Sequence, residues 1–273
     1  MLLRPGYLRQ TATMTDRWDP DRYHQFQAER RQPFDDLLAM VAPAPGGRAV
    51  DLGCGSGELT VELHRHLGAA ETVGVDTSPT MLESAAAHGA DGLTFAEGDL
   101  ATWLPANDPV DVALANASLQ WVDDHPTVLG RWRDGLVPGG QLAVQVPANF
   151  DHPSHTVAEE VGRTFGLDPI SRFEAVLSPE GYAERLDHLG FEAVHVRLQV
   201  YLHHLASTAA LIDWVRGTLL TRYQRDLGDE RFAEFLEQYG KALLERIGDP
   251  AGHRPYLHLF KRILFTARKP EIA

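Results

Sequence analysis

The chain has almost no cysteine. Cys54 stands alone among 273 residues, so no internal disulfide can form, which fits a reducing compartment. No run of roughly 20 apolar residues is present that could span a membrane. Residues 1–17 also lack the apolar stretch of about 7–15 residues that a secretory signal requires. Together these absences predict a soluble cytoplasmic protein.

Positive charge is also scarce. Lys and Arg number 25 against 38 Asp and Glu, which gives a formal net charge of −13. Nucleic acids and anionic membranes both need a basic face, so we expect neither as a partner. A small anionic substrate stays compatible with this charge, because it needs only a local cluster of cations.

Internal repeats and low-complexity segments are absent as well. Hydrophobic residues make up 44% of the chain, enough for a large core. We expect a disordered tail over residues 1–17, with Met14 as a second candidate for the start of translation. Residues 18–273 are expected to form a single domain.

The most informative feature that is present is the stretch VDLGCGSGELT at residues 50–60. A strand here leads into a turn containing Gly53, Gly55 and Gly57, whose missing side chains let a ligand approach the backbone. Asp76 follows 23 positions after Gly53, where an acidic residue suits the hydroxyls of a ribose. Glu58 replaces the last glycine of the dinucleotide pattern G-x-G-x-x-G. The turn therefore favours a nucleoside without a pyrophosphate, S-adenosylmethionine before NAD.

Short strands and helices alternate from residue 48 to about residue 147. A helix after the glycine turn is predicted from an apolar stripe, and a second helix from Ser78 as N-cap, Pro79 at the first position and Gly89 at the end. The predicted strands are the one containing Val50 and residues 71–76, 93–99, 110–116 and 141–147, the last preceded by a VPGG turn at 137–140. This order predicts an α/β fold with a Rossmann-like, doubly wound, mostly parallel sheet. Ligands of such sheets bind beyond the carboxyl ends of the strands.

The second half is less regular. We predict a helix over 179–190, a strand over 191–200, helical structure over 207–247 and a strand over 259–268. The helical segment between the two late strands is interpreted as a cap insertion, residues 203–257, and not as an independent domain. Residues 18–41 are expected to form an N-terminal helix outside the sheet core.

These motifs resemble the class I S-adenosylmethionine-dependent methyltransferases. The matching stretches are DLGCGSG (51–57), GVDTSP (74–79), EGDL (97–100) and LVPGGQLAV (136–144). Within that group, the chain is similar to the trans-aconitate methyltransferases in four further stretches: residues 18–34, NASLQW (116–121), VPANFDHPSH (146–155) and LIDWV (211–215). The resemblance spans about residues 18 to 268 and implies a methyl transfer from S-adenosylmethionine to a carboxylate of a small tricarboxylate.

The resemblance also implies roles for individual residues at the cofactor site. The glycine turn and the start of the next helix would hold the methionine part of the cofactor, and Asp51 would bind either this turn or the cofactor's amino group. Asp76 would bind the ribose, and Asp99 with the backbone of Leu100 would bind the adenine. Asn116 would lie near the sulfonium. Two alternatives stay open: Asp99 as a solvated loop acid, and Asn116 as a residue that closes a turn.

For the acid substrate the resemblance implies Tyr23, Arg30, Asn149, His155 and Trp214. Arg and His are expected to supply the positive charge that a tricarboxylate needs. We predict no metal, although His152 and His155 are three residues apart, because no carboxylate or thiolate has a suitable spacing. His203 and His204 are interpreted as solvated or core-edge residues, not as ligands.

No catalytic base is expected. A carboxyl group has a pKa near 4 and is already ionised at pH 7, so the rate would come from positioning the two reactants. The product would be a monomethyl ester, formed by a monomer or a weak dimer. The alternatives are another small acid, an acyl group on a carrier protein, and a cofactor-binding protein without transfer activity.

Overall fold

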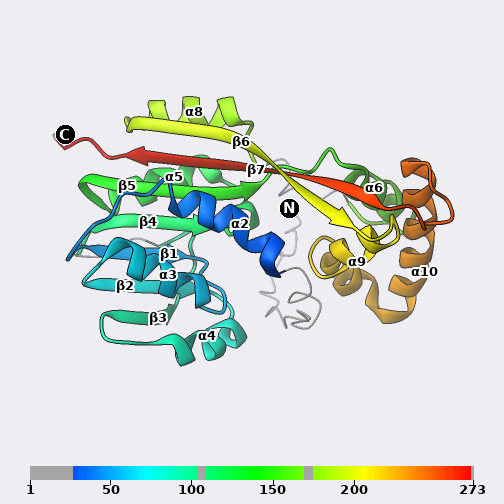
Figure 1. Ribbon diagram of the computed structural model, residues 1–273, viewed down its shortest axis with the longest axis horizontal. Helices are drawn as coiled ribbons and strands as arrows, with labels where there is room; N and C mark the ends of the chain where they lie inside the picture. Colours follow the sequence, from blue (N-terminus) through cyan, green and yellow to red (C-terminus); the bar gives the residue numbers. More distant parts are fainter. Residues whose placement is uncertain (1–26, 104–107, 169–174, 272–273) are drawn as a thin grey trace, which may run out of the picture.

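A computed structural model describes residues 27–103, 108–168 and 175–271, with side chains from residue 31 onward. Its centre is a seven-stranded sheet in the order β3-β2-β1-β4-β5-β7-β6 (Figure 1). The strands are β1 (Arg48–Leu52), β2 (Glu71–Asp76), β3 (Leu93–Glu97), β4 (Val110–Asn116), β5 (Leu136–Pro147), β6 (Glu192–Leu205) and β7 (Tyr256–Arg268). Strands β1 to β5 run parallel, whereas β7 is antiparallel to both β5 and β6. The predicted Rossmann-like, mostly parallel sheet is confirmed.

Helix α4 begins where local sequence signals place it. At the start of α4 the Ser78 side chain accepts a hydrogen bond from the Met81 N–H, and Pro79 occupies the first turn. The helical elements are α2 (Gln27–Leu38), α3 (Glu58–Leu67), α4 (Pro79–Ala85), η1 (Ala86–His88), η2 (Leu119–Trp121), α5 (His125–Asp134), α6 (Pro153–Thr164), α8 (Pro179–His188), α9 (Ala210–Arg216) and α10 (Thr221–Ile247). Helix α6 was not anticipated from the sequence.

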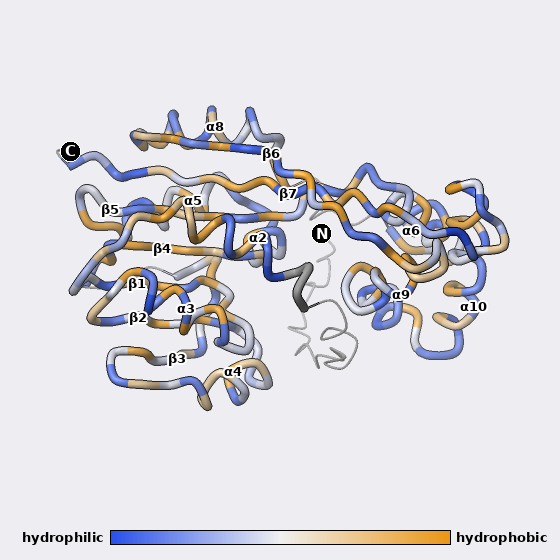
Figure 2. Tube along the Cα trace, in the orientation of Figure 1, coloured by the Kyte–Doolittle hydropathy of each residue, from blue (hydrophilic) through white to orange (hydrophobic). Residues whose placement is uncertain are grey.

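Alternate residues of the central strand β4 enter two different cores. Val112 and Leu114 pack with α2 and α3 on one face of the sheet, whereas Ala113 and Ala115 pack with α5 and α8 on the other. All four are fully buried, and β4 is accordingly drawn largely orange in Figure 2. A parallel strand covered on both faces is hydrophobic on both. The two cores fix the strands, and hence the positions of their carboxyl ends.

The VPGG stretch at 137–140, predicted to be a turn, instead lies within β5. Gly139 has a φ of +76°, yet its N–H donates to the Lys269 carbonyl at 2.9 Å. The Lys269 N–H donates in turn to the Gly140 carbonyl at 2.9 Å. Gly139 and Gly140 therefore bend β5 but do not end it, because Lys269, the residue after β7, forms backbone hydrogen bonds with them.

Beyond the sheet, β6 and β7 continue as a two-stranded ribbon, residues 201–205 paired with 256–260. We call this the ribbon. Tyr201, His203 and Leu205 are buried on one of its faces, whereas Leu202 and His204 are exposed on the other. This alternation extends both strands further than the predicted ranges of 191–200 and 259–268. The helical part of the expected cap insertion, residues 203–257, is therefore shorter than predicted, since β6 ends at Leu205 and β7 begins at Tyr256.

The far end of the ribbon carries helices α9 and α10, and α6 packs against them (Figure 1). We call these three helices the cap. They share an apolar core of their own, made by Val157 and Val161 of α6, Leu211 of α9 and Phe235 and Tyr239 of α10 among others. No helix in the described ranges is both long and apolar enough to cross a membrane.

Candidate functional site

The glycine turn after β1 is close-packed at two positions and open at the third. Gly53, Gly55 and Gly57 all have positive φ angles, of 82°, 55° and 83°, a region that favours glycine. A Cβ on Gly53 would lie 2.4 Å from the Ser118 Cβ, and one on Gly57 would lie 2.7 Å from the Phe95 ring. A Cβ on Gly55 would meet nothing within 4 Å. Gly55 is therefore the position where a ligand can approach the backbone.

Asp76, the last residue of β2, is fixed by two backbone groups. Its Oδ2 accepts from the Gly55 N–H at 2.9 Å, and its Oδ1 accepts from the Ser78 N–H at 2.9 Å. The carboxylate thus joins the glycine turn to the start of α4. Because each carboxylate oxygen can accept more than one hydrogen bond, both oxygens can still accept from a pair of ligand hydroxyls. This geometry fits the ribose role predicted for Asp76.

Asp51 lies beneath the same turn and is only 3% exposed. The Thr60 hydroxyl donates to its Oδ2 at 2.7 Å, which ties β1 to the first turn of α3. Burial, with a smaller contribution from the nearby charge of Asp76, raises the pKa of Asp51 to about 6 in spite of the hydrogen bond from Thr60. Burial likewise raises the pKa of the Cys54 thiol. Cys54 is consequently a protonated packing residue and not a nucleophile.

The other predicted cofactor residues follow β3 and β4. Asp99 is exposed, and its Oδ1 accepts from the Ala101 N–H at 2.8 Å. The Leu100 carbonyl accepts from the Trp132 indole N–H at 2.9 Å, which anchors this loop to α5. Asn116 ends β4. All eight predicted cofactor residues thus lie at or just after the carboxyl ends of β1 to β4, which we call the cofactor edge.

The residues predicted to bind the acid are more dispersed. Tyr23 lies outside the described residues, and of Arg30 only the backbone, in α2, is described. Asn149 follows β5 and is 1% exposed, with its Oδ1 accepting from the Lys261 N–H at 3.3 Å. His155 lies on α6, its Nδ1 3.1 Å from the Ser154 hydroxyl. Trp214 lies on α9 and is 5% exposed.

The buried face of the ribbon meets α6 and α9 in a cluster of rings. The Trp214 ring lies 4.7 Å from His203 and 5.6 Å from His258, and the His258 ring lies 4.8 Å from His152. We call these four residues the ring cluster. His203 is 5% exposed, so it packs inside the ring cluster, whereas its neighbour His204 faces solvent.

Arg262 joins the ring cluster to the cofactor edge, and the sequence analysis missed it. Its Nη1 donates to the Gln145 Oε1 at 2.9 Å, and the Gln145 Nε2 donates to the Asn116 Oδ1 at 2.9 Å. The guanidinium carbon lies 4.5 Å from the centre of the Phe260 ring, which in turn lies 5.5 Å from His258. A sequence signal for Arg262 was available: positions 256, 258, 260 and 262 alternate along a strand, so their side chains share one of its faces.

Three histidines of this region are uncharged at neutral pH. Burial lowers the pKa of His152 to about 4 and those of His155 and His258 to about 3. This differs from the expectation that histidine would supply positive charge for an acid: these three rings can only donate or accept hydrogen bonds, whereas Arg262, which lies over the neighbouring Phe260 ring, carries a charge. Among residues 27–103, 108–168 and 175–271, no three His, Cys, Asp or Glu side chains are grouped to hold a metal ion.

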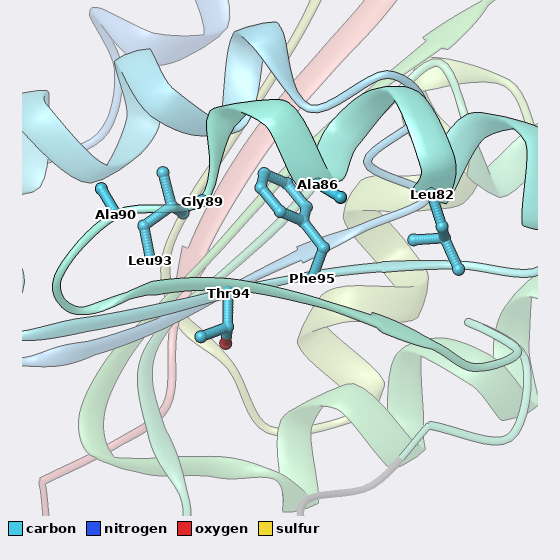
Figure 3. A pocket seen from close by; sticks show the side chains of 7 residues that line it. All are labelled: Leu82, Ala86, Gly89, Ala90, Leu93, Thr94 and Phe95. Atoms are coloured by element: carbon cyan, nitrogen blue, oxygen red, sulfur yellow. The ribbon is translucent and has the colours of Figure 1, made fainter.

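A separate cavity of about 530 Å³ lies beside the edge strand β3 and helix α4 (Figure 3). Its lining is Leu82, Ala86, Gly89, Ala90, Leu93, Thr94 and Phe95. Thr94 supplies the one polar side chain of that lining, and none of the predicted site residues takes part in it. A lining without a cation does not suit an acid, so this cavity is not the candidate site.

Comparison with known proteins agrees with this geometry. A family model described as a methyltransferase domain matches residues 49–140, which span β1 to β4 and the glycines of β5. A curated trans-aconitate 2-methyltransferase from Deinococcus radiodurans is 39% identical over 264 residues, 93% of this chain and 99% of that protein. One from Streptomyces avermitilis is also 39% identical, over 92% of this chain and 97% of the relative. One from Klebsiella pneumoniae is 38% identical over 93% and 99%.

Solved structures share the fold at low sequence identity. The YcgJ protein from Bacillus subtilis superposes with a TM-score of 0.60 at 13% identity, covering 88% of this chain and 99% of that one. A phosphoethanolamine N-methyltransferase from Haemonchus contortus, solved in complex with S-adenosyl-L-methionine, gives a TM-score of 0.56 at 19% identity, over 88% of this chain and 52% of that one. Identities this low bear on the fold alone.

Proposed function

This chain belongs to the trans-aconitate 2-methyltransferase family and is an S-adenosylmethionine-dependent methyltransferase, and on this basis we propose that it methylates one carboxylate of trans-aconitate. The products would be a monomethyl ester and S-adenosylhomocysteine. The observation that carries the choice of an acid is Arg262, a cation linked through Gln145 to Asn116 at the cofactor edge.

The proposed reaction needs no base. S-adenosylmethionine supplies a methyl group activated by a positively charged sulfur. An oxygen of the acid forms the new bond to the methyl carbon, and the electron pair of the broken carbon–sulfur bond stays on sulfur. Because the carboxyl group is already ionised at neutral pH, no proton has to move. The contribution of the protein would be to hold the oxygen in line with that bond at about 3 Å from the carbon.

The cofactor edge would bind S-adenosylmethionine. Asp76 would accept from the ribose hydroxyls while keeping its bonds to Gly55 and Ser78. The open face of Gly55 and the N–H groups at the start of α3 would receive the methionine carboxylate. Asp99 with the Leu100 backbone would take the adenine, and Asn116 would lie near the sulfur.

The acid would lie between the cofactor edge and the ring cluster. Arg262 would bind the reacting carboxylate, since a guanidinium can pair with a carboxylate through two hydrogen bonds. Asn149, His155 and Trp214 come from the three segments that converge beside it, and Tyr23 and Arg30 keep their proposed roles from the N-terminal segment. The neutral rings would exclude water, which strengthens the pairing between the acid and Arg262.

The experiment is a transfer assay with purified protein and methyl-labelled S-adenosylmethionine. The acids are trans-aconitate, cis-aconitate, citrate and a monocarboxylate, with the ester identified by mass spectrometry. We expect label in a trans-aconitate monomethyl ester and the highest kcat/KM for that acid. An ester of a different acid would point to another small substrate. Cofactor binding without any ester would point to a protein that has lost transfer activity.

A further inference from the structure

His258 is the least satisfied polar side chain of the ring cluster. It is 1% exposed, and neither of its ring nitrogens has a hydrogen-bond partner among the residues that the structure describes. A neutral imidazole carries one donor and one acceptor, and burying either without a partner costs free energy. Within the same described part of the chain, the amide Nδ2 of Asn149, which is also 1% exposed, has no partner either. Two buried groups that can donate a hydrogen bond, the His258 ring and the Asn149 amide, thus have no acceptor among the described residues.

The neighbouring histidines are already engaged. The Nε2 of His152 lies 3.0 Å from the Tyr256 hydroxyl, and its Nδ1 accepts from the Ser154 N–H at 3.1 Å. His155 is paired with the Ser154 hydroxyl. The turn that carries Asn149 also carries His152, because the His152 N–H donates to the Asn149 carbonyl at 3.0 Å. The His258 ring and the Asn149 amide therefore lie next to side chains that hydrogen bonds already hold in place.

Resting on the proposed function, we propose that His258 and the Asn149 amide donate hydrogen bonds to a second carboxylate of the substrate, one that is not methylated. Arg262 would hold the reacting carboxylate on the near side of the Phe260 ring, and His258 would hold the second on the far side. This subsite would select acids with two or more carboxyl groups over monocarboxylates. It would also decide which carboxylate faces the methyl group.

His258 would act as a neutral donor at physiological pH. Burial, together with the neighbouring His152, His203 and His155, lowers its pKa to about 3. A substrate carboxylate beside the ring would raise this pKa, because an opposite charge favours the protonated imidazole. A proton would therefore add to the attraction as the solution becomes more acidic.

Other titratable and charged groups surround His258. Tyr256 of β7 stacks on its ring, and Asp151 pairs with Lys261 at 2.5 Å. The Asp151 charge raises the pKa of His152 and His155, whereas Lys261 lowers that of His152. We expect KM for the acid to fall between pH 7.5 and 6, and this fall to be lost when His258 is replaced.

The test compares His258→Phe with His258→Gln. Phenylalanine keeps a ring but has no polar atom, whereas glutamine keeps a neutral N–H donor. We expect His258→Phe to raise KM for trans-aconitate about tenfold or more, as for the loss of a hydrogen bond to a charged group, with a smaller change in kcat. His258→Gln should recover most of this loss. Calorimetric titration of trans-aconitate into the protein with S-adenosylhomocysteine should give the same ranking.

Stability separates this role from a structural one. Because His258→Phe removes buried polar atoms that have no partner, we expect an equal or higher Tm together with the weaker acid binding. His204→Phe is the matched control, since His204 lies on the opposite, exposed face of the ribbon, and its KM should match that of the wild type.

Two results would overturn the inference, and they are distinguishable. An unchanged acid KM in His258→Phe, with an active wild type, would remove the subsite and leave the proposed function standing. A wild type that neither binds nor methylates any acid would refute the proposed function, and the subsite with it.

Discussion

The cofactor edge and the ribbon side of this protein are built from contacts of different range. At the cofactor edge, Asp51 bonds to a group nine residues away and Asp76 to one 21 residues away. On the ribbon side, His152 meets Tyr256 across 104 residues, and Arg262 meets Gln145 across 117. The bonds of Asp51 and Asp76 thus stay within β1, the glycine turn, α3 and β2, whereas those on the ribbon side form only when the last strand of the chain is in place.

The two regions also differ in charge. The cofactor edge presents the carboxylates of Asp76 and Asp99, which suit ligand hydroxyl and amino groups. The ribbon side presents the guanidinium of Arg262 next to neutral histidine rings, which suits an acid. A division of this kind would let a protein with a net charge of −13 accept the proposed anionic substrate, because the carboxylates and this cation lie on separate elements. Substitutions on one side should therefore weaken one ligand and spare the other.

The largest effect is expected from Asp76→Ala. The substitution leaves the Gly55 and Ser78 N–H groups without an acceptor and removes the proposed ribose contact. Each hydrogen bond to a charged group contributes about 1.5–3 kcal/mol, so the Kd for S-adenosylhomocysteine should rise about 100-fold or more. Isothermal titration calorimetry measures this change.

Glu97→Ala is the matched control for Asp76→Ala. Glu97 pairs in register with Asp76 on the neighbouring strand β3 and is exposed. It should change the cofactor Kd by less than about twofold, as surface substitutions generally do. If Asp76→Ala raised KM for the acid while leaving the cofactor Kd intact, the division between the two sides would be wrong.

A smaller effect is expected from Arg262→Met. Methionine keeps apolar contact with the Phe260 ring and removes the charge, so KM for trans-aconitate should rise about 10- to 100-fold. The Kd for S-adenosylhomocysteine should stay within about twofold. Arg262→Lys should recover part of the loss, because lysine keeps the charge but cannot pair bidentately.

Arg268→Met provides the control on the same strand. The Arg268 side chain is exposed and donates to the Gly139 carbonyl, away from the ring cluster. The KM of Arg268→Met for trans-aconitate should equal that of the wild type. A rise in cofactor Kd as large as the rise in acid KM for Arg262→Met would instead assign Arg262 to the cofactor edge.

The same difference in contact range explains what the sequence could predict. The parallel sheet, the glycine turn and the placement of Asp76 follow from signals within about 30 residues, the size of one βαβ unit. The fold prediction is confirmed, whereas the role of this edge in cofactor binding stays a prediction. The predicted turn at VPGG is wrong because Gly139 pairs with Lys269, a residue much more than 30 positions away.

The ribbon side could be predicted only in part. Asn149, His155 and Trp214 came from the resemblance, whereas Arg262 and His258 needed the pairing of β6 with β7 to show which face they share. Helix α6 did leave a local signal, with His152 as N-cap, Pro153 in the first turn and Val157 and Val161 four residues apart. This signal begins within the VPANFDHPSH stretch, so local sequence was enough to predict a helix there.

The smallest expected effect concerns stability in mild acid, and it tests whether the histidines in and beside the ring cluster are neutral. The folded pKa values of His152, His155 and His258, about 3 to 4, lie below the unfolded value of about 6.5. The unfolded state thus binds more protons between these limits, and stability falls as pH falls from about 6.5 toward 4. Asp51 acts in the opposite direction, because its folded pKa of about 6 exceeds its unfolded value, so the folded state takes up its proton first.

Each of these histidines adds up to one proton of difference, which changes the unfolding free energy by about 1.4 kcal/mol per pH unit. Urea denaturation between pH 4.5 and 6 should show stability falling with pH in the wild type. His258→Phe removes one such proton, so its slope should be smaller than that of the wild type by about 1.4 kcal/mol per pH unit. A slope unchanged by this substitution would mean that His258 is not held neutral in the folded protein, and the contrast between a charged cofactor edge and a neutral ring cluster would no longer hold.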